Sequence, residues 1–322
     1  MSSVQQEVDA RSNLAGTNKF EMLLFKLGEG QRGEKAEIFG INVFKVREIV
    51  AMPNVTAMAG ASPHMLGVVN LRGQIIPVID LPSVVGCVPK LGLRLILVTE
   101  YARTTQAFAV ESVDDIVRLD WGQVLSAEGH STSGMVTSIA RLDGDTHNTR
   151  LVQVLDVESI LQKVMPETVQ DVDSKSVHTQ VSIKPGSVIL AADDSSMARM
   201  LIEKGLEAMG LQYIMTRTGQ EAWEKLQTIA ATAKSEGKSI RDKVALVLTD
   251  LEMPEMDGFT LTRNIKQDAR FHDIPVVIHS SLSGSTNEDH VRKVQADAYV
   301  AKFEPEELAA TLRRVLAQVA VH

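Results

Sequence analysis

The stretch LTDLEMPEMDG, residues 248–258, decides how the second half of the chain folds. It begins where a short apolar run, residues 244–248, comes to an end. Such continuous apolar runs are typical of strands covered on both faces of a parallel sheet. Asp250 follows this strand directly, at the carboxyl edge where open α/β sheets bind their ligands. Asp250 is therefore the first candidate for a functional residue.

Strand and helix patterns alternate on both sides of this stretch. Further apolar runs lie at residues 188–192 and 275–278, and residues 196–209 carry an apolar stripe with helical spacing. A closing helix begins at Pro305, where the missing N–H of proline is tolerated. The pattern predicts a doubly wound α/β domain with a parallel sheet.

Polar side chains follow several of the predicted strands. These side chains are Asp193, Asp194, Asp250, Ser280 and Lys302. Clustered carboxylates bind Mg²⁺, and a carboxylate can attack phosphorus to form an acyl phosphate. Lys302 would pair with phosphoryl oxygens, and Ser280 would donate a hydrogen bond to them. Any one of these residues could be an ordinary cap or loop residue, but their joint occurrence at strand ends favours a phosphoryl-acceptor site.

These motifs resemble the receiver domain of response regulators such as CheY, over residues 187–318. The resemblance implies a flavodoxin-like fold with a five-stranded parallel sheet. It implies that Asp250 accepts the phosphoryl group, that Asp193 and Asp194 hold Mg²⁺ with the backbone carbonyl of Glu252, and that Ser280 and Tyr299 form a switch pair. Three departures are Phe303 in place of the usual proline, Gln295 in place of a common glycine, and a long segment 229–243.

The first half of the chain reads as short strands. They are predicted at residues 20–27, 66–71, 74–79, 93–99, 106–112, 135–142 and 150–155, with helices at 43–50 and 157–164. This pattern indicates an all-β domain. The glycines of residues 28–33 match a dinucleotide-binding fingerprint, but a strand-like run follows instead of the required helix, which favours a hairpin turn.

The informative run in this half is GVVNLRGQIIPVIDL, residues 67–81, in which Arg72 and Gly73 join two strands. With its flanking segments it resembles the CheW coupling family over residues 18–165. The resemblance implies two small five-stranded β-barrels that bridge chemoreceptors and the CheA histidine kinase. Positions that match the interaction surface of that family are Val46, Glu48, Gly67 and Arg72.

Composition limits the remaining possibilities. A formal net charge of −8 without a basic stripe argues against nucleic-acid binding, and the lone Cys87 fits a small buried thiol. No signal peptide or membrane-spanning run is recognisable, so we expect a cytoplasmic protein without direct membrane insertion. We predict an N-terminal tail (1–17), a CheW-like domain (18–165), a linker (166–186) and a receiver domain (187–318).

The order of the two domains is that of CheV-type chemotaxis proteins. It predicts a non-enzymatic adaptor that couples chemoreceptors to a CheA-type histidine kinase, is recruited to receptor arrays, and is regulated by phosphorylation of Asp250. One alternative is a phosphate sink that drains the kinase. Another is a Mg²⁺-dependent aspartyl-phosphate phosphatase, since Glu252 lies two residues after Asp250, but the chain shows no cap domain and Asp193 and Asp194 lie on a separate strand.

Overall fold

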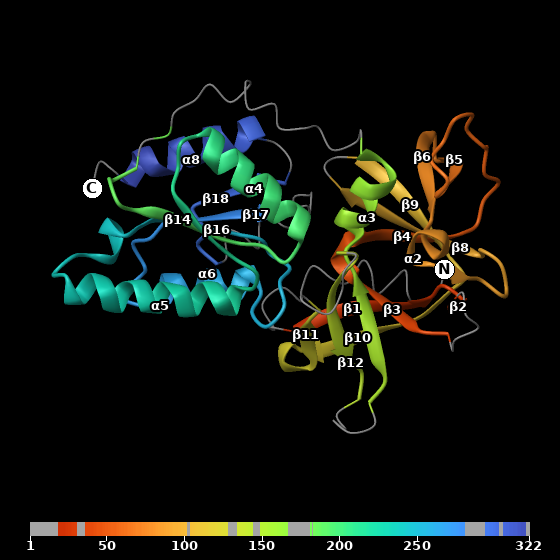
Figure 1. The fold of residues 1–322 in the computed structure, drawn as a ribbon, viewed down its shortest axis with the longest axis horizontal. Coiled ribbons are helices and arrows are strands. Elements are labelled where there is room, and N and C mark those ends of the chain that lie inside the picture. The colour runs from red at the N-terminus through yellow and green to blue at the C-terminus, as the bar shows by residue number, and fades with distance from the viewer. Residues whose placement is uncertain are drawn as a thin grey trace. The chain divides into compact units, whose positions relative to one another are not determined.

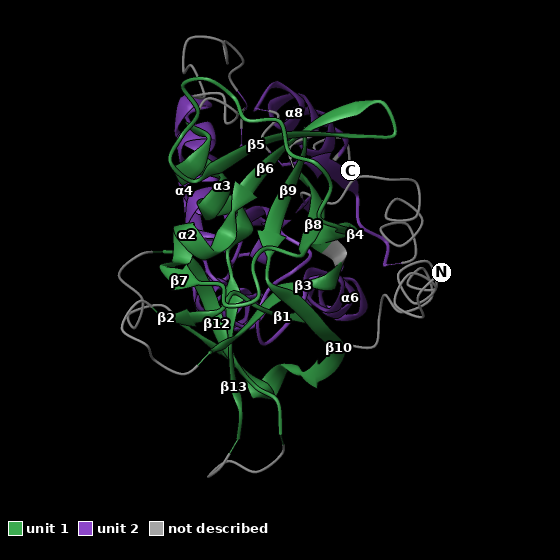
Figure 2. Ribbon diagram, turned by 90° about the vertical axis from the view of Figure 1, so that its right-hand side faces the viewer, with its two compact units in different colours: residues 1–14, 19–169 green, residues 15–18, 170–322 purple. Residues whose placement is uncertain are grey.

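The computed structural model describes residues 19–30, 36–101, 104–127, 134–143, 149–166, 181, 183–280, 294–302 and 305–319. The predicted tail 1–17, most of the predicted linker, and Phe303 lie outside the described residues. The chain divides into two compact units, one containing the described residues up to 166 and the other those from 181 onward (Figure 2). The predicted domain boundaries remain predictions.

The first unit contains two larger β-sheets (Figure 1). One has the order β10 (Ser112–Asp120), β1 (Lys19–Lys26), β3 (Ile38–Asn42), β13 (Leu151–Leu155), β12 (Val136–Arg141) and β11 (Val124–Ser126). The other has the order β4 (Val46–Ala51), β8 (Leu95–Tyr101), β9 (Thr104–Val110), β6 (Gln74–Asp80) and β5 (Met65–Leu71). Each predicted strand overlaps an observed one, and the short β11 makes the first sheet six-stranded where five strands were expected.

The helix predicted over residues 43–50 is wrong. A single 3-10 turn, η2 (Val43–Lys45), leads directly into β4, which pairs with β8. Apolar side chains at residues 43, 46 and 50 mimic a helical period, but the β-branched residues of this stretch favour a strand. Pairing with β8 supplies the backbone partners that a helix would otherwise provide. The predicted helix at residues 157–164 is confirmed as α3 (Val157–Val164).

The turn between β5 and β6 explains the sequence Arg72-Gly73. Both residues have positive φ, 52° and 88°, as a two-residue hairpin turn of the primed type requires. Asn70 Oδ1 accepts a hydrogen bond of 2.9 Å from the backbone N–H of Gly73. At this tip Arg72 Nη2 lies 2.8 Å from Glu48 Oε2, which joins the β5–β6 end of the sheet to its other edge strand, β4. The second sheet therefore curls toward a barrel.

Gly28 and Gly30, the described glycines of the fingerprint, do not open a helix. β1 pairs in antiparallel fashion with β3, the strand that follows them, as expected for a hairpin. Residues 31–35, which complete the motif, lie outside the described residues. A pyrophosphate site of the dinucleotide-binding type needs a helix N-terminus at this point, so the described structure supports the hairpin interpretation.

The second unit is a doubly wound α/β domain, as predicted. Its strands are all parallel, in the order β15 (Tyr213–Thr216), β14 (Val188–Ala192), β16 (Val244–Thr249), β17 (Val276–Ser280) and β18 (Ala298–Ala301). α4 (Ser196–Ala208) and α8 (Pro305–Val319) cover one face, and α5 (Gly219–Ser235) and α6 (Gly258–Gln267) cover the other (Figure 1). Both faces are apolar and buried, which accounts for the continuous apolar runs in the sequence.

Side-chain caps set where the helices begin, and so fix the loops above the sheet. Ser195 Oγ accepts from the N–H of Ala198, Thr218 Oγ1 from that of Glu221, and Asp257 Oδ1 from that of Thr260. Each bond satisfies a backbone donor that has no partner within its own helix. Among the described residues, no helix has both the length and the apolar character that crossing a membrane would require.

Gln295 stands where receiver domains commonly have a glycine, and its φ is positive, at 61°. A residue with a Cβ in this left-handed conformation is strained by about 1 kcal/mol. Gln295→Gly is therefore expected to stabilise the second unit by up to about 1 kcal/mol. Urea unfolding in a Trp121→Phe background measures this, because Trp223 of α5 is then the only tryptophan.

The matched control is the same substitution at Gln227, an exposed position within α5. There a glycine is expected to destabilise by about 1 kcal/mol, because it weakens a helix interior. Two substitutions with identical chemistry should thus change stability in opposite directions. A loss of stability at both positions would contradict the strain assigned to Gln295.

Candidate functional site

The candidate site forms where three parallel strands end. Asp193 follows the last residue of β14, Asp250 follows β16, and Lys302 follows β18. Since the strands are parallel and β14 is a neighbour of β16, both carboxylates emerge at the same edge of the sheet. The long side chain of Lys302 reaches them from the outer strand. The topology thus brings Asp193 and Lys302, which are 109 positions apart, to the same site as Asp250.

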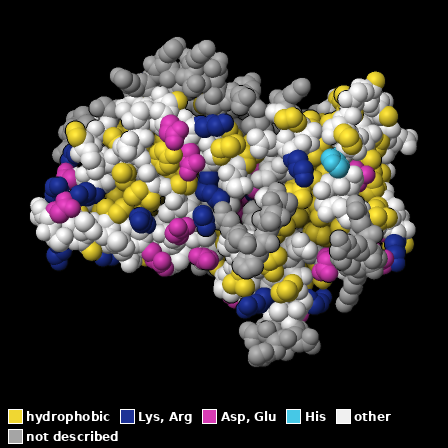
Figure 3. Space-filling view, in the orientation of Figure 1, with side chains coloured by type: hydrophobic (Ala, Val, Ile, Leu, Met, Phe, Trp, Pro, Cys, Tyr) yellow, Lys and Arg dark blue, Asp and Glu magenta, His cyan; other side chains and the backbone are white. Residues whose placement is uncertain are grey.

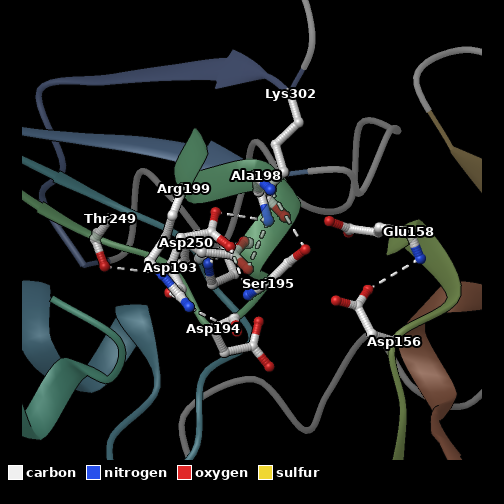
Figure 4. Close-up of polar contacts among 12 residues, drawn as sticks. Asp156, Glu158, Asp193, Asp194, Ser195, Ala198, Arg199, Thr249, Asp250 and Lys302 are labelled. Carbon is white, nitrogen blue, oxygen red and sulfur yellow. Dashed lines mark hydrogen bonds and ion pairs between the residues drawn. The ribbon is translucent and has the colours of Figure 1, made fainter. Parts of the chain in front are cut away.

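The ammonium group of Lys302 lies between two carboxylates (Figure 4). Lys302 Nζ is 2.8 Å from Asp193 Oδ2 and 2.9 Å from Asp250 Oδ2, and its side chain is 0% exposed. Charged groups removed from water in this way need close partners of opposite sign. The ion pairs therefore fix the positions of all three side chains at the end of the sheet.

Backbone contacts hold both carboxylates in place. Asp193 Oδ1 accepts a 3.0 Å hydrogen bond from the N–H of Ser195, and Asp250 Oδ1 accepts a 2.7 Å bond from that of Leu251. The N–H of Asp250 donates to the carbonyl of Ala192, 2.9 Å away. With one oxygen bonded to the backbone and the other to Lys302, each carboxylate is oriented before any ligand arrives.

Asp194 completes a group of three acids. One carboxylate oxygen each from Asp193, Asp194 and Asp250 lie within 4.8 Å of one another. Mg²⁺ holds its oxygens at about 2.0–2.1 Å in octahedral geometry, so that two ligand oxygens are about 3–4 Å apart. The spacing and the all-oxygen donor set therefore fit a magnesium ion after a small contraction. Glu252, whose backbone carbonyl was predicted to contribute, is buried just after Asp250.

Ser280 lies on β17, the neighbour of β16, and Tyr299 lies on β18, the next strand outward. Ser280 is the last residue of β17, is buried, and accepts through its carbonyl a 3.4 Å hydrogen bond from Tyr299 Oη. The same carbonyl accepts the backbone N–H of Lys302 at 3.0 Å. Burial, and after it the negative charge of Asp250, raises the pKa of Tyr299. The phenol therefore stays a neutral hydrogen-bond donor at neutral pH.

The four predicted partner-binding positions lie in the second sheet of the first unit. Val46 and Glu48 belong to β4, Gly67 to β5, and Arg72 to the turn after it. Val46 and Gly67 are buried, whereas the side chain of Arg72 is 78% exposed. Gly67 also has a structural role, because a Cβ there would lie 2.1 Å from the carbonyl oxygen of Thr56. Partner binding by these residues stays a prediction.

Charged side chains of both signs are scattered over the visible face of the molecule (Figure 3). Lysines and arginines lie singly or beside acidic residues there, and the described part of that face carries no continuous basic stripe. Ion pairs such as Lys238–Glu236 and Lys184–Asp242 also place side chains of opposite charge next to one another. The described part of this face therefore offers no extended basic surface of the kind that binds nucleic acid.

Sequence reasoning assigned no role to three residues that shape the site. Arg199 donates hydrogen bonds to the carbonyls of Asp193 and Asp194, Thr249 Oγ1 lies 2.9 Å from the carbonyl of Asp250, and Gly258 lies against that same carbonyl. All three act through backbone atoms, which a residue pattern does not reveal. The one usable signal was Gly258, a glycine at the first position of a helix.

Comparisons with known proteins identify a known domain family in each half of the chain. The CheW-like domain family matches residues 21–165, and the response regulator receiver domain family matches residues 189–313. Chemotaxis protein CheV2 of Helicobacter pylori is 29% identical over 97% of this chain and 99% of its own length. Chemotaxis protein CheY1 of the same organism is 32% identical over 40% of this chain and 95% of its own.

Among solved structures, the scaffolding protein TtCheW from Thermoanaerobacter tengcongensis is 25% identical, with a TM-score of 0.37, over 42% of this chain and 88% of its own. The match to CheV2 of Helicobacter pylori, in contrast, runs through both units of this chain, so it accounts for both domains and for their order. The chain therefore belongs to the CheV-type family of chemotaxis proteins, with a CheW-like domain followed by a response regulator receiver domain.

Proposed function

We propose that the chain is an adaptor that couples chemoreceptors to a CheA-type histidine kinase and is regulated by phosphorylation of Asp250. One observation carries the proposal. Asp250 and Asp193 flank the buried ammonium group of Lys302, with Asp194 close by, in a chain whose other domain is CheW-like. The acids and the lysine offer the chemistry of phosphoryl acceptance, and the CheW-like domain offers the connection to the kinase.

In the proposed transfer, a carboxylate oxygen of Asp250 attacks the phosphorus of a phosphohistidine on the kinase. A P–O bond forms and the P–N bond breaks, so the electron pair stays on the imidazole nitrogen, which takes up a proton. Lys302 then pairs with a phosphoryl oxygen, exchanging one anionic partner for another. The backbone N–H of Leu251 holds the other oxygen of Asp250, which keeps the nucleophile aligned during the attack.

The acids Asp193, Asp194 and Asp250, together with the backbone carbonyl of Glu252, would hold Mg²⁺. When bound, the ion supplies positive charge that offsets the repulsion between the carboxylates and the incoming phosphoryl oxygens. Lys302 by itself supplies only one positive charge against three acids. The donor set thus explains why the proposed transfer needs a divalent cation.

Ser280 and Tyr299 are the candidate residues that would respond to phosphorylation of Asp250. The hydroxyl of Ser280 would turn toward the phosphoryl group, and Tyr299, now bonded to the carbonyl of Ser280, would turn inward. Their strands, β17 and β18, are paired, so a shift at one residue is transmitted to the other. We infer that this change alters the contact of the receiver with the CheW-like domain or with the receptor array.

The adaptor would act at the receptor array and would catalyse no reaction on other molecules. It is a cytoplasmic protein recruited to membrane-associated receptor arrays through its CheW-like domain, with Val46, Glu48, Gly67 and Arg72 near the partner surface. It is not an enzyme beyond slow loss of its own phosphoryl group. Its partners are the kinase and the receptors, and it binds no nucleic acid.

Mixing the full chain with purified, radiolabelled phospho-CheA tests the first step. Label is expected on the wild type in Mg²⁺ and on Asp242→Asn, an exposed aspartate paired with Lys184. Asp250→Asn is expected to reduce labelling at least 100-fold, since it removes the anionic nucleophile. Equal labelling of Asp250→Asn and wild type would refute the assignment of Asp250.

The second step is tested with receptors and kinase reconstituted with the adaptor. Under phosphorylating conditions, kinase activity should differ between arrays that contain wild type and arrays that contain Asp250→Asn. The Asp242→Asn variant should match the wild type. The same kinase activity for all three, with label confirmed on the wild type, would show that phosphorylation does not regulate coupling.

A further inference from the structure

Arg199 occupies an unexpected position next to the acidic site. It lies in the first turn of α4, where the helix dipole favours acidic side chains over basic ones. Its guanidinium group is turned back toward the loop that carries the acids (Figure 4). Nη1 donates to the carbonyl oxygen of Asp193 at 3.0 Å and to that of Asp194 at 2.9 Å. Asp193 and Asp194 also supply carboxylates to the candidate cation site.

These two bonds fix the backbone on either side of the Asp194 side chain. The carbonyl of Asp193 precedes the Cα atom of Asp194, and the carbonyl of Asp194 follows it. With both peptide planes oriented, the direction of the Cα–Cβ bond is set, because the backbone has only two soft dihedral angles per residue. The carboxylate of Asp194 is thereby directed toward those of Asp193 and Asp250.

Arg199 bonds to the backbone of both acids, whose carboxylates lie in different surroundings. The carboxylate of Asp193 is buried and is held at both oxygens, by Ser195 and by Lys302. Asp194 is only half-buried, and its carboxylate must keep its place in the group of three acids from a loop. The bonds from Arg199 also turn the two carbonyl oxygens toward the guanidinium, which leaves the carboxylates as the oxygens that this loop offers to a cation.

We propose that Arg199 is a positioning residue for the divalent cation: it sets the carboxylate of Asp194 by clamping the carbonyls of Asp193 and Asp194. This inference rests on the proposed function, since it assumes that the three acids bind Mg²⁺. The role is distinct from general support of the fold. It predicts an effect on cation affinity that a merely structural arginine would not have.

Isothermal titration of the full chain with MgCl₂ tests this role. Arg199→Met keeps a long, helix-compatible side chain but removes the donors. It is expected to weaken Mg²⁺ binding by about tenfold, the lower end of what loss of an outer-shell partner costs a metal site. Arg199→Lys keeps a cationic donor and is expected to recover most of the affinity, within about threefold of wild type.

The chain offers a matched control in Arg241. It is also half-buried and also donates to a backbone carbonyl, that of Ala245 at 3.0 Å, near the start of β16 and so at the opposite edge of the sheet. Arg241→Met should therefore leave Mg²⁺ affinity unchanged. Thermal unfolding in EDTA measures how much stability each substitution costs when no divalent cation is bound.

The outcomes are separable. Weaker binding by Arg199→Met with recovery in Arg199→Lys supports the proposal. Unchanged affinity in Arg199→Met, or an equal loss in Arg241→Met, overturns it and leaves Arg199 a structural residue. If Arg199→Met does not fold, Arg199→Gln takes its place, because its shorter side chain cannot make both bonds, and an unchanged Mg²⁺ affinity in Arg199→Gln overturns the proposal. A wild type that binds no Mg²⁺ removes the cation site itself, and with it both this inference and that part of the proposed function.

Discussion

Gly258→Ala is expected to destabilise the receiver domain by about 3 kcal/mol, because the added methyl group has no room. An ideal Cβ at this position would lie 1.9 Å from the carbonyl oxygen of Asp250. That contact involves backbone on both sides, so rotation of a side chain cannot relieve it. The N–H of Gly258 also donates to the carbonyl of Leu251 at 2.9 Å, which closes the loop on itself.

The same substitution should impair phosphoryl acceptance in the molecules that remain folded. Relief of the clash must move α6 away from the end of β16, or move the backbone of Asp250 itself. Either movement shifts the Asp250 carboxylate relative to Lys302, which is now 2.9 Å away. A displacement of about 1 Å at a reacting group can cost about 100-fold in rate. We therefore expect slower labelling by phospho-CheA even at a temperature where the variant is folded.

Urea unfolding followed by Trp223 fluorescence in the Trp121→Phe background measures the stability change. Gly205→Ala is the control, since Gly205 lies inside α4 and its Cβ would meet nothing within 4 Å. Alanine there is expected to stabilise the helix by about 0.5–1 kcal/mol. Similar stabilities for Gly258→Ala and Gly205→Ala would show that the loop after β16 can yield without cost.

The sequence was sufficient to predict the acidic site because its geometry follows from the topology. Once residues 188–192 and 244–248 are recognised as parallel strands, the positions of Asp193 and Asp250 at one edge follow. Lys302 could be added because it follows another predicted strand. The structure then supplied the distances, which no sequence pattern contains.

Other features escaped prediction because they depend on contacts between distant segments. β4 was misread because its local apolar spacing imitates a helix, whereas its strand partner, β8, lies about 50 residues away. The edge strand β10 was missed because Asp114 and Asp115 interrupt its apolar pattern, as charges at sheet edges commonly do. The role of Arg199 depends on backbone carbonyls and was likewise invisible in the sequence.

Lys302→Met is expected to lower the stability of the receiver domain by about 3–5 kcal/mol at neutral pH without divalent cations. The substitution keeps the length of the side chain but leaves the buried carboxylates of Asp193 and Asp250 facing one another without the intervening ammonium. Lys238→Met is the control, because Lys238 pairs with Glu236 at an exposed position, where such pairs contribute at most about 1 kcal/mol. Trp223 fluorescence during urea unfolding, in the Trp121→Phe background, reports both variants.

A double-mutant cycle with Asp250→Asn identifies the cause of the loss. If the damage is electrostatic repulsion between carboxylates, then removing the charge of Asp250 in the Lys302→Met chain should restore about 1–3 kcal/mol relative to additivity. Addition of Mg²⁺ should likewise stabilise Lys302→Met more than wild type, because the ion replaces the missing positive charge. Additive losses, unaffected by Mg²⁺, would instead mean that Lys302 acts through packing alone. The Lys302–Asp250 ion pair would then no longer support a charge-balanced phosphoryl-acceptor site at the end of β16.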